Sequence, residues 1–282
     1  MKRALVLAGG GVAGIAWELG VLRGLQDADP DLADRVIAAD LIVGTSAGSA
    51  VAAQITSGTP LADLYDRQLD EASAEIEVEL DMEELFARFT AATAGVTSLD
   101  EALRAIGALA LRTKTVAEEP RLAAVAARLP VPTWPDRAVL VPAVDAETGE
   151  TVVFTRDSGV ALVDAVAASC AVPGVWPPVT IGGRRYIDGG VRSGTNADLA
   201  AGSDRVLVIV PSLPDQPDPF HRLDEEIERL KPAAVLVVYA DAASAAAFGR
   251  NPLSPATRPP AARAGRKVGL SHAAEVAAFW GS

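Results

Sequence analysis

The sequence predicts an α/β fold, a three-layer sandwich in which helices flank a mostly parallel central sheet. Twice within the first 60 residues, a short apolar run ends in a glycine turn and is followed by a segment with helical character. Strongly apolar, β-like runs recur at residues 205–210 and 234–239. Strands that alternate with helices in this way are typical of a parallel sheet covered on its faces.

The first half of this pattern can be assigned from apolar spacing. Residues 3–8 are a short apolar run, expected to form a buried strand, and residues 15–28 carry apolar side chains at near-helical spacing. A second β-like run covers residues 39–43, and residues 47–55 again look helical. The segment 61–129 is rich in Ala, Leu, Glu and Arg and contains no motif that carries chemistry, so we expect a helical insert or cover.

Glycine and proline mark the boundaries of the second half. A hairpin is expected between strands at 138–144 and 151–154, and residues 160–168 look helical. Gly182 and Gly183 indicate a second hairpin. No domain linker is evident. We therefore expect one catalytic domain over residues 3–212, which is completed by a strand and Ala-rich helices in residues 213–282, with breaks at 251–252 and 259–260.

Composition and charge exclude several classes of function. The net charge of −12 argues against nucleic acid as a partner. With one cysteine and two histidines the chain lacks metal-site spacings and cannot form a disulfide within itself, so we expect no metal, no cofactor and a cytoplasmic protein. No stretch reaches the roughly 18–20 apolar residues that a membrane span needs.

Residues 44–48 read G-T-S-A-G and match the pattern G-x-S-x-G. In this pattern a serine lies on a sharp turn between strand and helix, with its hydroxyl exposed, and Gly44 and Gly48 leave room for neighbouring backbone. The helix that follows directs its amides and positive dipole end toward developing negative charge. Ser46 is therefore a candidate nucleophile, and the alternative is a serine that only caps the helix.

Residues 9–14 read G-G-G-V-A-G and also match G-x-G-x-x-G. Such a loop can offer free backbone amides to an oxyanion, bind a dinucleotide, or form a plain tight turn. A dinucleotide site would need an acid near the end of the second strand, whereas Asp40 lies at its start. The motif G-K-[ST] is absent, which excludes a P-loop. We favour the oxyanion function.

The serine needs a base, and three residues could serve. Asp188 ends a β-like run and is followed by Gly189 and Gly190, which allow close approach to another loop. A carboxylate in a partly dry site can accept the serine proton directly. His221 and His272 both follow Asp188 in the chain and would complete the order Ser, Asp, His of an α/β-hydrolase triad.

Taken together, these motifs resemble the patatin-like phospholipase family. Residues 9–14 look like its oxyanion loop, residues 44–48 like its nucleophile elbow, and residues 188–190 like its D-G-[GA] motif. The segment 168–178 is similar to the one that precedes that motif. The resemblance implies a Ser46–Asp188 dyad without a catalytic histidine. It also implies an oxyanion hole formed by amides of Gly10, Gly11 and Val12, with Gly9 and Gly14 shaping the loop.

This resemblance implies a serine acyl hydrolase that cleaves carboxylic esters of lipids, of the phospholipase A, lipase or esterase type. The expected partner is a lipid or small ester, with at least transient membrane contact. One departure is Ala13, because the family usually carries Arg or Lys there. Two alternatives remain at this point: a triad esterase that uses His221 or His272, and a catalytically weak lipid-binding module.

Overall fold

The computed structural model describes residues 1–215 and 222–281. Its sheet has the order β5-β6-β3-β2-β1-β7-β8, and β4 pairs with β3 beside this path. The strands are β1 (Arg3–Leu7), β2 (Leu41–Gly44), β3 (Ala138–Asp145), β4 (Thr151–Phe154), β5 (Val179–Ile181), β6 (Arg184–Asp188), β7 (Arg205–Val210) and β8 (Ala234–Tyr239).

Helices occupy most of the remaining described chain. The α-helices are α1 (Gly11–Ala28), α2 (Pro30–Ile37), α3 (Ala47–Ile55), α4 (Leu61–Leu69), α5 (Met82–Ala92), α6 (Leu99–Arg112), α7 (Glu118–Arg128), α8 (Leu162–Ser169), α9 (Leu223–Leu230), α10 (Ala242–Phe248) and α11 (Arg258–Trp280). Short 3-10 helices are η1 (Arg156–Ser158), η2 (Gly189–Val191), η3 (Ala197–Ala200) and η4 (Pro255–Thr257).

The centre of the sheet is parallel. Strand β1 pairs in parallel with β2 and β7, β2 with β3, and β7 with β8. The antiparallel part lies beyond β2, where β3 pairs with β4 and β6, and β6 pairs with β5. The predicted α/β class, with a mostly parallel sheet between helices, is confirmed.

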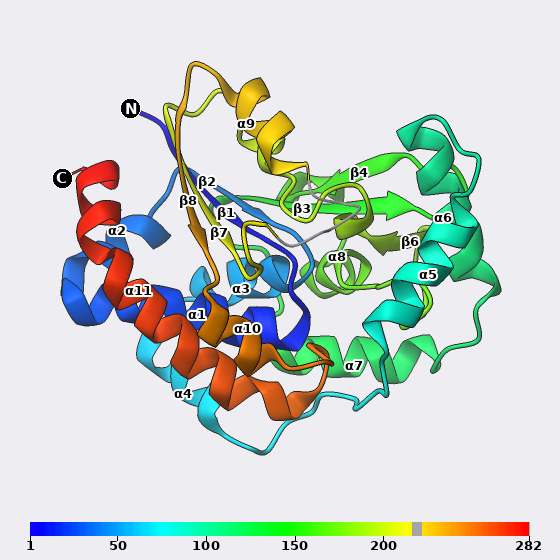
Figure 1. Ribbon diagram of the computed structural model, residues 1–282, viewed down its shortest axis with the longest axis horizontal. Helices are drawn as coiled ribbons and strands as arrows, with labels where there is room; N and C mark the ends of the chain where they lie inside the picture. Colours follow the sequence, from blue (N-terminus) through cyan, green and yellow to red (C-terminus); the bar gives the residue numbers. More distant parts are fainter. Residues whose placement is uncertain (216–221, 282) are drawn as a thin grey trace.

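Alternate side chains of the strands build the two main layers of the core. On β1, Leu5 and Leu7 pack into the larger cluster, with side chains of α1, α3 and α11. Ala4 and Val6 point to the opposite face and pack with residues of η3 and α9. Figure 1 shows α1, α3 and α11 on one side of the central strands and α9 on the other. This two-residue period follows from strand geometry and buries apolar surface on both faces.

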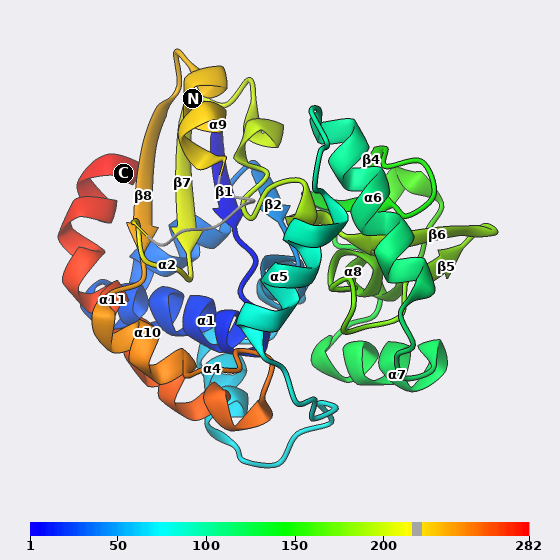
Figure 2. The ribbon, with the colours of Figure 1, turned by 45° about the vertical axis from the view of Figure 1, so that its right-hand side comes forward.

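The segment 61–129 divides between two places in the fold. Helix α4 packs against α1 and α11, on the same side of the sheet. Helices α5 and α6 contribute to a third cluster, in which Leu85 and Leu103 pack with Val144 of β3 and Ile187 of β6. Figure 2 shows α5, α6 and α7 near β4, β5, β6 and α8, away from α11. These last helices therefore lie close to the end of β6.

Three details differ from the expectations. Helix α1 begins at Gly11, inside the glycine loop, and α2 follows it directly. Asp29 caps α2 by accepting a hydrogen bond from the Asp31 amide, and Pro30 occupies its first position. The prolines at 259–260 do not break a helix but lie in the first turn of α11, where a proline loses no helical hydrogen bond.

In the described chain, no helix is long and apolar enough to cross a membrane.

Candidate active site

Ser46 lies on the turn that joins β2 to α3. Its backbone has φ 50° and ψ −114°, so a non-glycine residue is held at positive φ. Such a conformation costs energy and persists only where the surroundings enforce it. Strain of this kind at the start of a helix is what a nucleophile elbow requires.

Hydrogen bonds from two directions hold this strained backbone. The Ser46 N–H donates to Oγ of Ser169 at 3.0 Å, and that hydroxyl in turn donates to the carbonyl of Pro142 on β3 at 2.7 Å. The Ser46 carbonyl accepts from Oγ of Ser49 at 2.6 Å and from Sγ of Cys170 at 3.2 Å. Burial raises the pKa of Cys170, which favours the neutral thiol that can donate this bond.

The two glycines of the elbow are required by close packing. A Cβ on Gly48 would lie 2.1 Å from the Leu7 carbonyl oxygen, and one on Gly44 would lie 2.5 Å from the Gly48 carbonyl oxygen. Both distances are far shorter than van der Waals contact. The turn therefore packs tightly on the end of β1, which is also where the glycine loop begins.

Asp188 ends β6 and faces the serine. Oγ of Ser46 donates to Oδ2 of Asp188 at 2.7 Å, while the Gly190 N–H donates to Oδ1 at 2.7 Å. Asp188 is only 4% exposed. Burial raises its pKa to about 7, although the hydrogen bonds from Gly190 and Ser46 act in the opposite direction. Oδ1 of Asp188 is thus held by the Gly190 N–H, and Oδ2 is in position to accept the proton of the Ser46 hydroxyl.

Gly189 allows the Asp188 turn to approach the sheet. A Cβ on Gly189 would lie 2.3 Å from the Pro142 carbonyl oxygen, and one on Gly190 would lie 2.9 Å from Oδ1 of Asp188. Larger residues would push the carboxylate away from Ser46. The structure therefore gives each glycine of the D-G-G motif a steric reason.

The glycine loop joins β1 to α1 and passes beside the elbow. The N–H of Gly9 donates to the Gly194 carbonyl at 2.8 Å, and that of Gly14 to the Gly10 carbonyl at 2.8 Å. Among the described residues, the N–H groups of Gly10, Gly11 and Val12 have no acceptor. They lie at the positive end of the long helix α1, an arrangement that suits a developing negative charge.

A cavity of about 630 Å³ connects these parts. Ser46, Asp188 and residues 9–11 line one side of it, whereas Val12 does not reach it. The volume lies within the range of 300–1,000 Å³ common for ligand sites. Its other walls are largely apolar. The apolar residues that helices α5 and α10 contribute are Met82, Leu85, Phe86, Phe89, Ala245 and Phe248, and α5 also contributes the acidic Glu83.

Of the two histidines, the structure describes His272, which is not part of this arrangement. His272 lies inside α11, not at a helix start, and its Nδ1 is 3.0 Å from the Val268 carbonyl oxygen of the same helix. His221 lies outside the described residues. In the described chain, the side chain bonded to the Ser46 hydroxyl is the Asp188 carboxylate.

In a comparison with protein families, the model of the patatin-like phospholipases matches residues 5–201. The chain belongs to the patatin-like phospholipase family. The match covers the glycine loop, the elbow and the Asp188 turn. Comparison with curated proteins gives no match.

Two solved structures resemble this patatin-like chain at low sequence identity. VipD from Legionella pneumophila is 16% identical with a TM-score of 0.40, and the match covers 80% of this chain and 52% of that one. The type III effector protein ExoU is 18% identical with a TM-score of 0.43, and the match covers 98% of this chain and 53% of that one. The patatin-like chain thus spans about half the length of these two proteins.

Position 13 of the patatin-like chain holds a fully buried alanine, but α7 brings a cation close to the site. Arg121 is 4% exposed, and its guanidinium carbon lies 3.8 Å from the centre of the Trp176 ring. Its Nη1 is 3.9 Å from Glu75, which Arg128 already binds with two bonds of 2.6 Å. Burial lowers the pKa of Arg121 to about 10, so it stays charged at neutral pH, and this charge lowers the pKa of Asp188.

Sequence reasoning missed three residues that support the site. Ser169 lies in the segment 168–178, which resembles a segment of the family, but the sequence did not indicate a role for this residue. Arg121 lies on a helix whose composition carries no signal of chemistry. Asn196 follows the D-G-G motif by a few residues, and its contacts with both loops of the site become visible only in three dimensions.

Proposed function

We propose that this protein is a lipid acyl hydrolase of the phospholipase A, lipase or esterase type, which acts through a Ser46–Asp188 dyad. The observation that carries the proposal is the 2.7 Å hydrogen bond from Oγ of Ser46 to Oδ2 of a buried aspartate. A hydroxyl is a weak nucleophile at its ordinary pKa and needs an adjacent base. Membership in the patatin-like family supports the same chemistry.

In the proposed acylation step, Oδ2 of Asp188 takes the proton from Oγ of Ser46 while Oγ attacks the ester carbonyl carbon. The carbonyl oxygen becomes negative and receives hydrogen bonds from the free amides of Gly10 and Gly11, whereas Val12, which was also expected as a donor, does not line the cavity. Asp188 then gives its proton to the departing alcohol oxygen as the C–O bond breaks. An acyl-Ser46 ester and a free alcohol are the products.

Deacylation repeats these steps with water. Asp188 removes a proton from water as the water oxygen attacks the acyl carbonyl, and the same amides stabilise the second oxyanion. Collapse of this intermediate breaks the bond to Oγ, and the proton held by Asp188 returns to Ser46. The released product is a carboxylic acid. Neither step needs any group beyond the residues named and water.

The cavity supports a substrate with an apolar acyl chain. Leu85, Phe86 and Phe89 of α5 extend the wall beyond Ser46 and Asp188, and Val172 and Val191 add further apolar surface. Burial of an acyl chain stabilises the complex by about 0.8 kcal/mol for each buried methylene group. We therefore propose a lipid or small ester as substrate, taken up during transient contact with a membrane or micelle.

A panel of phospholipids, glycerides and short-chain aryl esters tests this proposal on the purified protein. We expect release of fatty acid from at least one lipid, together with stoichiometric labelling of Ser46 by a fluorophosphonate, located by mass spectrometry. A protein that binds lipid vesicles but neither hydrolyses the panel nor reacts with the probe would contradict the proposal. That result would favour the lipid-binding module.

The pH dependence of the reaction should report the unusual pKa of Asp188. The carboxyl group must be ionised to accept the serine proton, and burial raises its pKa to about 7. We therefore expect kcat/KM to increase with pH, to be half-maximal near pH 7 and to fall about tenfold per pH unit below it. If this decrease in kcat/KM, the acidic limb of the profile, were instead centred near pH 4, where an ordinary aspartate titrates, the proposal that buried Asp188 is the base would be contradicted.

Arg121 should shift that acidic limb. Its positive charge lowers the pKa of Asp188, so Arg121→Met is expected to move the limb to higher pH, whereas Arg121→Lys should keep it closer to wild type. The measurement is kcat/KM from pH 5 to 9 for the three proteins. Identical profiles for wild type and Arg121→Met would show that this charge does not act on the base.

A further inference from the structure

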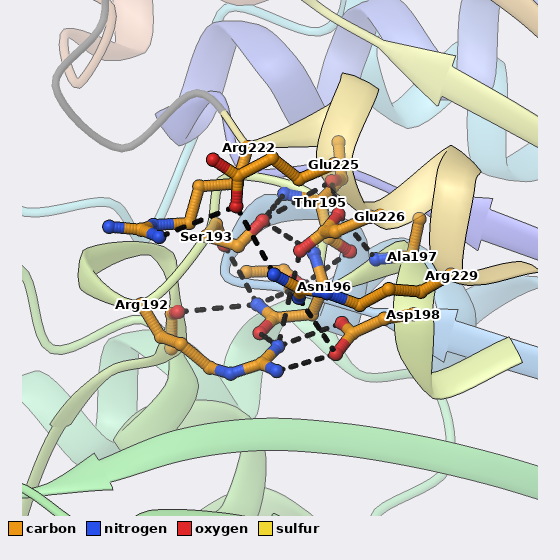
Figure 3. Close-up of polar contacts among 12 residues, drawn as sticks. Arg192, Ser193, Thr195, Asn196, Ala197, Asp198, Arg222, Glu225, Glu226 and Arg229 are labelled. Carbon is orange, nitrogen blue, oxygen red and sulfur yellow. Dashed lines mark hydrogen bonds and ion pairs between the residues drawn. The ribbon is translucent and has the colours of Figure 1, made fainter. Parts of the chain in front are cut away.

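A buried polar network lies directly behind the Asp188 turn, in the loop that leads to η3. Figure 3 shows that it connects this loop with α9, and Asn196 lies near its centre. Asn196 has no exposed surface, and its φ of 50° places it in the left-handed region, which asparagine tolerates better than most residues. A fully buried amide side chain in this conformation indicates a specific requirement for its hydrogen bonds.

The orientation of the Asn196 side chain is fixed by a cation. Its Oδ1 accepts a hydrogen bond from Nη1 of Arg192 at 2.7 Å, and a guanidinium can only donate. Arg192 is itself held by Asp198 through two bonds of 2.9 and 2.6 Å. The amide nitrogen must therefore point the other way, toward the site.

That nitrogen contacts both loops of the proposed dyad. Nδ2 of Asn196 donates to Oγ1 of Thr45 at 3.1 Å and to the Gly189 carbonyl at 3.2 Å, and to the Ser193 carbonyl at 2.8 Å. Thr45 immediately precedes Ser46, and Gly189 immediately follows Asp188. One amide group thus links the residues adjacent to both members of the pair.

The sheet itself does not join these two loops. Ser46 follows β2 and Asp188 ends β6, and β3 lies between these strands in the sheet. Ser169 ties the Ser46 backbone to Pro142 on β3, and in the described chain its hydroxyl makes no hydrogen bond to the Asp188 turn. Within the described chain, Asn196 is the side chain that bonds to both the elbow and the Asp188 turn, and Oγ1 of Thr45 adds a bond of 3.2 Å to the Thr195 carbonyl of the same loop.

The network anchors Asn196 on its far side as well. Oε2 of Glu226, on α9, accepts from Oγ1 of Thr195 at 2.5 Å and from the Ala197 N–H at 2.9 Å. The residues on both sides of Asn196 are thus fixed to a helix of the opposite layer. A side chain held in this way can act as a rigid spacer.

We propose that Asn196 is a positioning residue that sets the distance between Ser46 and Asp188. The inference rests on the proposed function, because it assigns to Asn196 the alignment of the proposed nucleophile and base. A displacement of about 1 Å in a reacting group can lower the rate by roughly 10²-fold. Loss of the amide link should therefore reduce kcat, whereas the acyl-binding wall formed by α5, and with it KM, stays unchanged.

Two substitutions test the link in complementary ways. Asn196→Asp keeps the shape and the tolerance of the left-handed conformation but removes both N–H groups. Asn196→Gly removes the side chain and keeps the backbone freedom. The control is Arg229→Ala, which removes the ion pairs of the half-exposed Arg229 with Asp198 at 3.8 Å and with Glu225 at 3.1 Å and does not touch Asn196. Active sites are counted by fluorophosphonate titration, so that unfolded protein does not lower the measured kcat.

We expect kcat per titrated site to fall by about 10- to 100-fold in both Asn196 variants, with KM within about twofold of wild type. Thr45→Val removes one of the acceptors and should lower kcat by less. Thr45→Val also removes the bond from Oγ1 to the Thr195 carbonyl. Its combination with Asn196→Gly should still be less than additive, because both changes break the bond between Asn196 and Thr45. Arg229→Ala should resemble wild type.

Unchanged kcat per titrated site in both Asn196 variants would overturn the inference, whatever their thermal stability. Additive effects of the Asn196 and Thr45 substitutions would also overturn it. These outcomes differ from failure of the proposed function, which would appear as a wild-type protein without turnover or labelling at Ser46. In that case the inference would fall with it.

Discussion

Replacing Ser46 with alanine is expected to lower ester hydrolysis by on the order of 10⁶-fold, the size of effect seen when a serine hydrolase loses its nucleophile. Asp188 would remain in place with its Oδ1 bonded to Gly190, but its Oδ2 would lose the serine hydroxyl. Because the acyl-enzyme can no longer form, fluorophosphonate labelling should disappear together with turnover. The measurement is single-turnover hydrolysis of an aryl ester by purified protein.

A matched control comes from the other end of helix α3. Ser57→Ala removes a hydroxyl that bonds to the Gln54 carbonyl and to Thr59, away from the cavity. This variant should keep wild-type kcat and labelling. Hydrolysis by Ser46→Ala at more than a few per cent of wild type would exclude Ser46 as the nucleophile, provided both proteins show the same circular dichroism spectrum.

The second large effect is expected for Asp188→Asn. An amide cannot accept the serine proton, so kcat should fall by about 10²- to 10⁴-fold, the range for loss of a general base. The variant should also be more stable than wild type at alkaline pH. The pKa of Asp188 is raised in the folded protein, so the ionised carboxylate lowers stability as pH rises from about 4 through about 7.

Thermal midpoints and histidine variants make this prediction specific. The increase in Tm for Asp188→Asn should be largest near pH 8 and should vanish below about pH 3, where Asp188 is protonated in both the folded and the unfolded state. His272→Ala and His221→Ala should keep wild-type kcat. If either histidine variant loses activity as severely as Asp188→Asn, the triad replaces the dyad as the mechanism.

Much of the fold could be predicted because local rules agree with the tertiary structure there. The runs at residues 3–8 and 205–210 are apolar on both faces, and they became the buried parallel strands β1 and β7. The hairpin at Gly182 and Gly183 formed between β5 and β6 as its turn residues indicated. Helix boundaries were less accurate, since α1 begins at Gly11 through packing of the loop and not through apolar periodicity.

The candidate site could be predicted in its parts but not in its contacts. Steric constraints on a turn are local, so glycines around Ser46 and after Asp188 left a clear pattern in the sequence. The bonds that join these turns connect residues more than 140 positions apart, such as Ser46 with Asp188 and Asn196 with Thr45. No periodicity or spacing encodes such pairs.

The α/β class, the family resemblance and the candidate roles of Ser46 and Asp188 could be read from the chain alone, because these depend on residue type and short-range order. The folded structure was needed to show that the Asp188 carboxylate contacts the serine, that burial raises its pKa to about 7, and that Arg121 lies close enough to lower it. Burial and charge–charge distance are properties of the packed chain. They arise only when β2, β6 and α7 come together around one cavity.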